Sequence, residues 1–489
     1  MTANVAVIGS GFAGMAAACF LAKNGCKVTV FEKNTAVGGR ARSFSAEGFK
    51  FDMGPSWYWM PDTFDRFFAH FGKKTSDYYE LVQLDPGFRM IFGKEDLLDI
   101  PASFDALCAE FERIEKGSTA NLIKFLEEAK YKYEVAMGDM VYKPCLSWSE
   151  FMTPKVMMSA MGLNMFSSVS KQVRKYFKDH RLIDLMEFPV LFLGETARNI
   201  PGMYSLMNHA ALSQGTWYPM GGMVKIVEAM HELAQELGVQ FVTDCEVQQI
   251  NISNGKATQL TTSKGNYAVD GVIGAADYNH IESKLLDPAY TNYNDAYWEE
   301  RTFAPSSLLF YLGVNKRVKS LKHHNLFFDT SLDVHAAEIY ERPQWPSDPL
   351  FYVCCPSKTD DAVAPAGMEN LFVLIPIAPG IEDTPEIRAR YYDMVMARLE
   401  KYCEEPVRDH IVYNKSYCVK DFVNDYNAYK GNAYGLANTL RQTAVFKPSL
   451  RNKKVKNLFY SGQLTVPGPG VPPSLVSGQL AAEQLLKVL

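Results

Sequence analysis

Three glycines near the start of the chain, Gly9, Gly11 and Gly14, have the G-x-G-x-x-G spacing of a dinucleotide-binding turn. The apolar run before them predicts a buried strand, and the apolar spacing of residues 16–23 predicts a helix. Gly9 permits the tight turn, Gly11 lets the backbone approach a pyrophosphate, and Gly14 lets the helix pack closely on the strand. The helix N-terminus then offers unpaired N–H groups and a positive dipole end to the phosphates.

Glu32 supplies the carboxylate that such a site requires. It follows a second predicted strand, residues 27–31, and lies 18 positions after Gly14. At about that distance an acid accepts hydrogen bonds from the ribose hydroxyls. The strand, helix, second strand and acid therefore all occur in the order that a dinucleotide fold needs.

A second turn indicates which dinucleotide is bound. Gly38 and Gly39 add a flexible segment near the phosphates, and Arg40 offers a fixed fork of N–H donors to pyrophosphate oxygens. A domain that binds only a nicotinamide cofactor does not need this addition. A flavoprotein that holds FAD permanently often has it, so we predict FAD.

Composition limits the other possibilities. The net charge is −5 and no basic stripe stands out, which argues against a nucleic-acid partner. The 9 cysteines are dispersed, without metal-ligand spacing, so we expect no metal, no disulfide framework and a reducing compartment. The first strand leaves no room for a signal peptide, and no run of 18 uncharged apolar residues occurs. We therefore expect a cytoplasmic protein.

The organisation of the chain predicts an α/β fold with a discontinuous Rossmann-like FAD-binding domain. Its three parts are residues 1–74, 216–294 and 421–489, because a strand and small meander recur mid-chain and a strand with a Gly/Pro loop recurs near the end. Residues 75–215 are expected to form a helical, partly apolar insert. Residues 295–420 contain several apolar runs and are expected to form the mixed sheet of a substrate domain.

Nearly the whole sequence resembles the bacterial-type phytoene desaturase family, the FAD-dependent carotenoid desaturases, which includes hydroxycarotenoid 3,4-desaturases. The matching segments are VIGSGFAGMAAA, EKNTAVGGRARS, GFKFDMGPSWYWMP, GTWYPMGGM, HHNLFF, YVCCPS, PAGMENLFVLIPIAP, VNDYNAYKGNAYGLANTLRQTAVFKP and LFYSGQLTVPGPGVPPSLVSG. Two positions depart from the pattern. Thr465-Val466 stands where many relatives have Thr-His, and Gln463 stands where wider flavoprotein relatives place an acid.

The resemblance implies FAD as hydride acceptor and a carotenoid, a long apolar polyene, as substrate. The reaction it implies is formation of C=C bonds, in phytoene or in a later step such as 3,4-desaturation of a hydroxylated or monocyclic carotene. The FAD contacts that it implies are Gly9, Gly11, Phe12, Ala13, Gly14, Glu32, Lys33, Gly39, Arg40, Gly54, Pro55, Ser56, Val247, Gly462, Gln463, Gly470, Val471 and Pro472.

Desaturation also needs an acceptor for the hydrogen that leaves as a proton. Glu195, His209 and His335 lie in apolar surroundings in the sequence and are the candidates. No Ser/His/Asp arrangement, metal cluster or second nucleotide motif competes for the chemistry. Three alternatives remain open: a carotenoid isomerase or saturase of the same superfamily, a flavin oxidase of amines or porphyrinogens, and a carotenoid-binding protein with a vestigial FAD site.

An uncharged stretch rich in Met, residues 156–169, suggests contact with a membrane. It is too short to cross a bilayer but could lie on its surface, and a polyene substrate dissolves in lipid. We therefore expect peripheral association with the membrane surface. Either a membrane quinone or oxygen would then accept the electrons.

Overall fold

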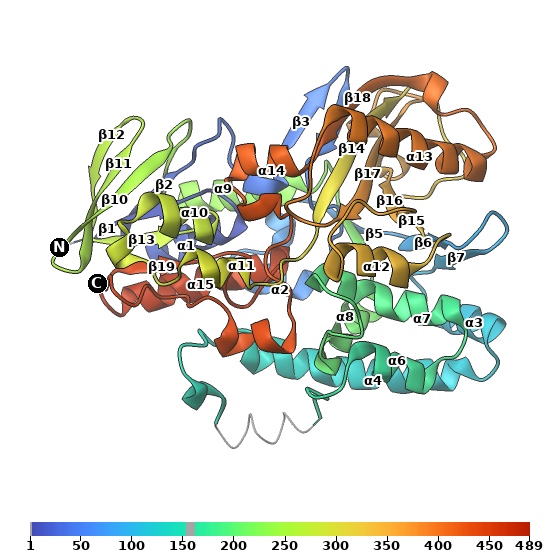
Figure 1. Cartoon of the computed structure of the whole chain (residues 1–489), viewed down its shortest axis with the longest axis horizontal. Coiled ribbons are helices and arrows are strands. Elements are labelled where there is room, and N and C mark those ends of the chain that lie inside the picture. The colour runs from blue at the N-terminus through green and yellow to red at the C-terminus, as the bar shows by residue number, and fades with distance from the viewer. Residues whose placement is uncertain (1, 153–161) are drawn as a thin grey trace.

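Two sheets and a group of helices make up most of the computed structural model, which describes residues 2–152 and 162–489 (Figure 1). The nucleotide-binding region lies at one end and contains both chain termini. A second, larger sheet lies at the other end, and a group of helices lies below it. The α/β class predicted from the sequence is confirmed.

A five-stranded parallel sheet, in the order β19-β13-β1-β2-β9, forms the nucleotide-binding region. Its strands come from three distant parts of the chain, and α1, α9 and α15 share its hydrophobic core. The bounds are β1 (Asn4–Ile8), α1 (Phe12–Lys23), β2 (Lys27–Phe31), α9 (Val224–Glu236), β9 (Gln240–Val242), β13 (Gly271–Gly274), β19 (Leu458–Tyr460) and α15 (Val471–Leu486). An antiparallel meander lies beside it, made of β10 (Val247–Ser253), β11 (Lys256–Thr262) and β12 (Gly265–Ala268).

Small residues let α1 and α15 approach closely. Ala16, Ala17 and Ala18 of α1 are fully buried. A Cβ at Gly478 of α15 would lie 2.2 Å from the carbonyl oxygen of Ala13, so that position accepts only glycine without a shift. The close packing fixes where α15 begins, at the edge of the nucleotide site.

The larger sheet has seven strands in the order β18-β14-β17-β16-β15-β6-β7. Helix α13 shares a core with one face, and the other face belongs to the core that includes the helical segment. The bounds are β6 (Phe88–Ile91), β7 (Leu97–Ile100), β14 (Ser306–Val314), β15 (His324–Phe327), α12 (Leu332–Tyr340), β16 (Phe351–Cys354), β17 (Glu369–Ile377), α13 (Pro385–Cys403) and β18 (Ile411–Tyr417). Strands β6 and β7 come from the segment expected to be helical, because β6 pairs with β15 and extends the sheet.

Helices make up most of the rest of the segment from 75 to 215. They are α3 (Phe104–Ile114), α4 (Ser118–Val135), α6 (Val169–Tyr176), α7 (His180–Glu187) and α8 (Leu206–Asn208). The other elements are β3 (Ser43–Ala46), β4 (Phe49–Asp52), α2 (Pro61–Ala69), β5 (Leu81–Gln83), β8 (Trp217–Pro219), α10 (Tyr278–His280), α11 (Asp295–Glu299) and α14 (Val419–Tyr426).

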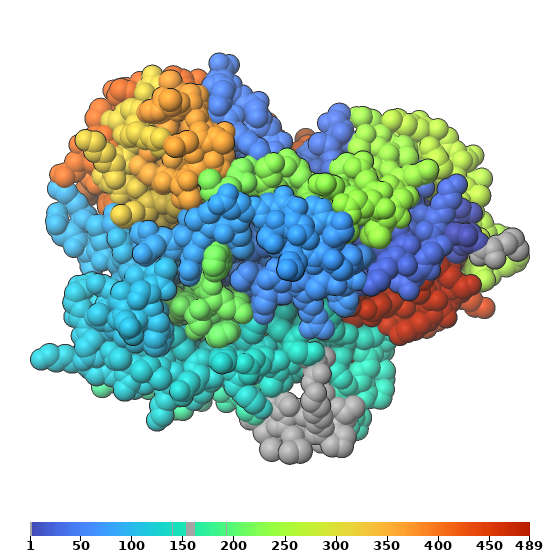
Figure 2. Space-filling model, turned by 180° about the vertical axis from the view of Figure 1, so that it is seen from behind, coloured from blue at the N-terminus to red at the C-terminus, as the bar shows by residue number. Residues whose placement is uncertain are grey.

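Seen from behind, the surface shows two upper lobes (Figure 2). One lobe, yellow to orange, belongs to the larger sheet, and the other, mainly green to yellow-green, contains the middle part of the nucleotide-binding region. The helical segment, in teal, lies below them. Among the described residues, no helix is both long enough and apolar enough to cross a membrane.

Candidate functional site

A cavity of about 480 Å³ connects the glycine-rich turn after β1 to an apolar cleft beside the seven-stranded sheet. The turn, the end of β2, α14 and the start of α15 line its nucleotide part. Strands β14, β15 and β17 and helix α12 line its apolar part. Apolar residues of this second part include Leu309, Leu326, Leu332, Ile339, Phe372 and Leu374.

The glycine-rich turn leaves room for a ligand. Gly9 has φ +101°, a conformation that favours glycine, and a Cβ at Gly14 would lie 2.0 Å from the Gly9 carbonyl oxygen. A Cβ at Gly11 would meet no atom within 4 Å, and Gly11 lines the cavity with Phe12 and Ala13. Gly14 lies behind the lining. The open space beside Gly11 and the start of α1 fits a pyrophosphate.

Glu32 is buried at the edge of the same cavity and holds the turn in place. Its Oε2 accepts hydrogen bonds from the Ser10 N–H (3.0 Å) and the Ser10 hydroxyl (2.6 Å). Its Oε1 accepts from the backbone N–H and the side-chain amide of Asn34, both at 2.9 Å. The Ser10 hydroxyl can rotate away from Glu32 Oε2, which frees that oxygen to accept a hydrogen bond from a ribose hydroxyl.

Arg40 and Gly39 also line the cavity, and a Cβ at Gly39 would lie 3.2 Å from Gly11 Cα. One guanidinium N–H₂ of Arg40 donates to the Asn432 carbonyl oxygen (3.2 Å), and the guanidinium lies 5.0 Å from the Tyr426 ring centroid. Burial lowers the pKa of Arg40, and the nearby Asp277 carboxylate opposes that shift. The buried Arg40 Nε has no partner among the described residues. A phosphate oxygen is the kind of group that would satisfy it.

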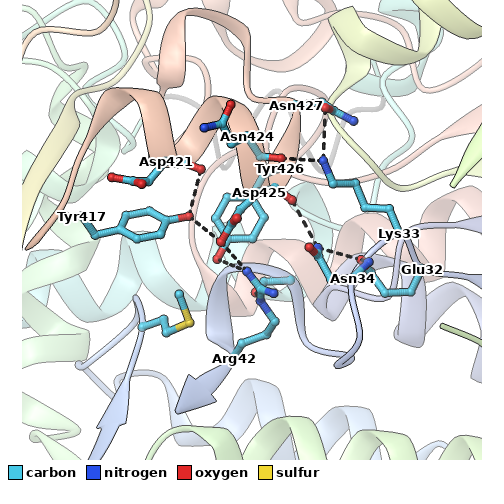
Figure 3. A network of polar contacts seen from close by, with 12 residues as sticks. Glu32, Lys33, Asn34, Arg42, Tyr417, Asp421, Asn424, Asp425, Tyr426 and Asn427 are labelled. Atoms are coloured by element: carbon cyan, nitrogen blue, oxygen red, sulfur yellow. Dashed lines mark hydrogen bonds and ion pairs between the residues drawn. The ribbon is translucent and has the colours of Figure 1, made fainter. Parts of the chain in front are cut away.

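A polar network joins helix α14 to the segment that follows β2 (Figure 3). The Lys33 ammonium donates to the Asn424 carbonyl oxygen (2.6 Å) and to Asn427 Oδ1 (3.3 Å). Arg42 forms an ion pair with Asp425 at 2.7 Å. Lys33 lines the cavity, but its charged end is bonded to this network. The network therefore holds the end of α14 against the ribose side of the cavity.

The predicted residues of the C-terminal loop all line the cavity: Gly462, Gln463, Gly470, Val471 and Pro472. Gly470 has φ +110° and directly precedes α15. Because Pro472 and Pro473 have no N–H, this end of the helix can offer a ligand only the N–H groups of Gly470 and Val471. The predicted Gly54, Pro55, Ser56 and Val247 also line the cavity.

His335 is the one predicted proton acceptor that lines the cavity. Its Nε2 lies 2.8 Å from the Pro376 carbonyl oxygen, and its Nδ1 accepts a hydrogen bond from the Leu350 N–H at 3.0 Å. Burial lowers its pKa to about 4. Both ring nitrogens are engaged with the backbone, so the neutral ring has no lone pair available to a substrate.

Glu195 and His209 are not part of the cavity lining. Glu195 is buried, its Oε1 accepts from the Thr196 N–H (2.7 Å), and burial raises its pKa. Its charge helps to raise the pKa of Tyr340, which lines the cavity, although burial is the larger cause. The His209 ring lies 5.2 Å from the Tyr133 ring, and burial lowers its pKa.

The structure also brings Tyr352, which the sequence did not single out, to the cavity beside the predicted Ser56. Ser56 Oγ accepts a hydrogen bond from the Tyr352 hydroxyl (3.1 Å), which lies 2.6 Å from Nδ1 of His324, behind the lining. The ring of Trp57 stacks on His324, with centroids 4.1 Å apart. These residues belong to the FDMGPSW, HHNLFF and YVCCPS segments. The segments marked the family, but only the β15–β16 pairing places His324 beside Tyr352.

The same pairing gathers three potential metal ligands that sequence spacing did not indicate. His324 is the register partner of Cys354, and one ligand atom from each of His323, His324 and Cys354 lies within 4.8 Å of the others. All three side chains are buried. Nδ1 of His323 and Nδ1 of His324 already lie within hydrogen-bond distance of Thr359 and Tyr352 hydroxyls.

The sequence and fold agree with known flavoproteins. Residues 12–486 match the model of the flavin containing amine oxidoreductase family. An oxidoreductase from Methanosarcina mazei superposes with a TM-score of 0.63 at 17% identity, covering 97% of this chain and 98% of that one. A putrescine oxidase with bound putrescine gives a TM-score of 0.62 at 14% identity, covering 100% and 99%. These likenesses show the fold.

Closer relatives support the resemblance seen in the motifs. The chain is 42% identical to a carotenoid 3,4-desaturase of Haloarcula japonica over 99% of its own length and 98% of the relative's. It is 31% identical to a zeta-carotene-forming phytoene desaturase of Myxococcus xanthus, over 99% and 93%. The predicted FAD cofactor and oxidoreductase class are confirmed. The chain belongs to the family of flavin-containing amine oxidoreductases, alongside the carotenoid desaturases.

Proposed function

We propose that this protein is an FAD-dependent carotenoid desaturase that forms C=C bonds in a long polyene. The observation that carries the proposal is the single cavity shared by the dinucleotide motif and the apolar cleft. A polyene offers no charged group and few polar ones, and the cleft presents mainly apolar side chains. The relatives that cover nearly the whole chain carry carotenoid desaturase names.

Each part of the cavity has a task in this reaction. Bound FAD supplies the acceptor for a hydride. Gly11 and the start of α1 bind the pyrophosphate, Glu32 binds the ribose, and the start of α15 lies where it can stabilise negative charge. The apolar part orients the polyene and excludes water. Because neighbouring double bonds delocalise the positive charge left by hydride loss, positioning is the protein's main contribution.

We propose a late desaturation, at the 3,4 bond, in preference to the first steps on phytoene. The identity to the 3,4-desaturase is 42%, against 31% to the phytoene desaturase, and the 3,4-desaturase is covered almost completely. Its substrate would already be coloured. A hydroxylated acyclic carotene and a monocyclic carotene are both candidates.

Expression in a host that supplies single carotenoid precursors tests the proposal. We expect a product two hydrogens lighter per new bond, with absorption shifted to the red because conjugation lengthens. An isomer of unchanged mass, or a product two hydrogens heavier, would instead identify an isomerase or saturase. Turnover of an amine or a porphyrinogen without polyene turnover would identify an oxidase. Tight polyene binding without reaction would identify a binding protein.

We also propose that the protein docks on a membrane surface without spanning it. The stretch 156–169 lies partly outside the described residues, but Phe166, in its described part, is 96% exposed, and Met152, shortly before it, is 69% exposed. Trp148 and Phe446 are also exposed, and their rings lie 5.3 Å apart. Aromatic and apolar side chains of this kind enter the lipid interface.

Flotation with phospholipid vesicles tests the docking. The protein should float with the vesicles, and Trp148→Glu with Phe446→Glu should weaken flotation. Val412→Glu, which changes an equally exposed valine on β18, is the matched control and should float normally. An enzyme that desaturates carotenoid in vesicles yet never floats with them would contradict this surface. Comparing turnover in air with anaerobic turnover on added quinone then identifies the electron acceptor.

A further inference from the structure

Three buried side chains with metal-binding atoms lie together where β15 pairs with β16. They are His323, His324 and Cys354, with exposed fractions of 4%, 0% and 2%. One nitrogen of each imidazole and the sulfur of Cys354 lie within 4.8 Å of one another. Neither the predicted cofactor contacts nor the proposed reaction uses these atoms.

We propose that His323, His324 and Cys354 bind a Zn²⁺ ion that clamps β15 to β16. Two imidazole nitrogens and a thiolate are ligands that Zn²⁺ prefers in proteins. Tyr352, which lines the large cavity, follows Phe351 on the same strand as Cys354, so the clamp steadies that part of the cavity wall. The ion takes no part in desaturation, and the site is therefore independent of the proposed function.

The hydrogen bonds of His324 leave one of its nitrogens able to bind a metal. The Tyr352 hydroxyl donates to Ser56 Oγ at 3.1 Å, so its oxygen accepts the proton of His324 Nδ1, 2.6 Å away. A neutral ring with its proton on Nδ1 carries a lone pair on Nε2. That Nε2 is buried and has no hydrogen-bond partner in the described part of the chain. Metal-ligating histidines are oriented in this way, by a hydrogen bond from the other ring nitrogen.

His323 shows the same pattern. Its Nδ1 lies 2.7 Å from Thr359 Oγ1, and its buried Nε2 has no partner among the described residues. Two adjacent imidazoles therefore each have one nitrogen held by a hydroxyl and one nitrogen that no described group contacts. A buried polar atom costs free energy unless a hydrogen bond or a metal ion satisfies it.

A small cavity of about 20 Å³ lies against two of these ligands. His323 and Cys354 line it, and so do Asp52, Tyr218 and Asn370. That volume holds one water molecule or an ion of similar size. When Zn²⁺ binds, the S–H bond of Cys354 breaks, a S–Zn bond forms, and the proton passes to solvent. The thiolate and the Asp52 carboxylate then place two negative charges beside the doubly charged ion.

Strand pairing already brings the ligands close to the spacing that a metal requires. His324 and Cys354 are register partners in the antiparallel pair, and His323 directly precedes His324. Ligand atoms bound to a tetrahedral ion at about 2.0–2.3 Å lie about 3.3–3.7 Å apart. The separations here are at most 4.8 Å, so each pair needs to close by about 1.5 Å at most, which side-chain rotation can supply.

Zinc binding to the FAD-loaded protein tests the site. After treatment with a chelator, the protein is titrated with Zn²⁺, and bound metal is measured by mass spectrometry. We expect one ion per chain and a higher Tm, because the ion binds the folded state. Cys354→Ser and His323→Gln should each weaken binding by more than about 100-fold, since each loses a ligand. Cys355→Ser is the matched control and should bind normally, because that buried thiol belongs to the core on the other face of the sheet.

Two further measurements identify the ligands. Tyr352→Phe removes the acceptor that orients His324, so it should weaken Zn²⁺ binding by roughly 10–100-fold. In the wild type, Co²⁺ in place of Zn²⁺ should give a thiolate-to-cobalt charge-transfer band in the difference spectrum, and this test stands even if a variant fails to fold. A wild type that binds neither ion, or a cobalt spectrum without that band, would overturn the site. Equal Zn²⁺ binding by Cys354→Ser would indicate an adventitious ion only and would overturn it as well. None of these results depends on turnover, so each leaves the desaturase function standing.

Discussion

At the scale of single residues, Glu32 makes the most specific prediction about cofactor binding. It accepts four hydrogen bonds from Ser10 and Asn34 and lies at the cavity edge. Glu32→Ala should weaken FAD binding by about 1–3 kcal/mol, because a bound ribose hydroxyl loses its acceptor and the turn loses its support. Flavin titration and the FAD retained after gel filtration measure this. Glu236→Ala, at a surface ion pair with Lys73, is the control. Equal affinity in all three proteins would contradict the role of Glu32.

Residue type alone does not show which candidate proton acceptor has a ring nitrogen or carboxylate available to a substrate. His335 was predicted because it is an ionisable group in an apolar stretch, and it does line the cavity. Its hydrogen bonds to two backbone groups could not be foreseen, because they depend on where β17 and the segment before β16 lie. In the sequence His324 is only one residue of a family motif. The pairing of β15 with β16 brings it within hydrogen-bond distance of the Tyr352 hydroxyl.

At the scale of secondary-structure elements, the start of α15 carries a prediction. Val471 lines the cavity and is the first residue of the helix. Val471→Asp would place a negative charge where the reduced flavin is expected to carry one, so activity should fall more than FAD content. Val488→Asp, beyond the other end of the same helix, should change neither. Steady-state turnover and bound flavin are measured together. If activity and FAD content fall equally in Val471→Asp, the loop contacts the cofactor elsewhere.

Local elements could be predicted closely, and their long-range assembly could not. The strand predicted at 27–31 is β2, Lys27–Phe31, because an apolar run between turn signals depends only on neighbouring residues. Helix α1 begins at Phe12, earlier than the predicted 16, because Gly11 is its N-cap and Gly14 lies in its first turn. The addition of β6 and β7 to the larger sheet depends on pairing with β15, more than 200 residues away, which periodicity cannot indicate.

At the scale of the whole molecule, buried neutral histidines predict instability in acid. Burial lowers the pKa of His323 to about 3 and that of His335 to about 4. An unfolded histidine titrates near 6.5, so between pH 6.5 and 4 the unfolded state binds more protons and stability falls as pH falls. His335 should account for about 3 kcal/mol of this loss at most. Denaturant unfolding at several pH values should show a shallower acid slope in His335→Gln. An identical slope would show that His335 does not contribute.

The arrangement of the whole chain also explains why the nucleotide-binding region is discontinuous in sequence. Three distant segments form the nucleotide-binding sheet, and the segments between them form the apolar part of one cavity. The polar network between Arg42, Lys33 and α14 fixes the chain that enters from the larger sheet against the ribose side (Figure 3). The glycine-rich turn and the apolar lining therefore belong to one continuous cavity.

Anaerobic mixing of the oxidised, FAD-loaded enzyme with a panel of acyclic, hydroxylated and monocyclic carotenoids tests the central claim most directly. With the right polyene, the flavin absorption band should bleach in a single turnover. A product two hydrogens lighter, with absorption shifted to the red, should appear in an amount equal to the flavin reduced. A panel that gives neither flavin reduction nor a lighter product would contradict the account of this protein as a carotenoid desaturase.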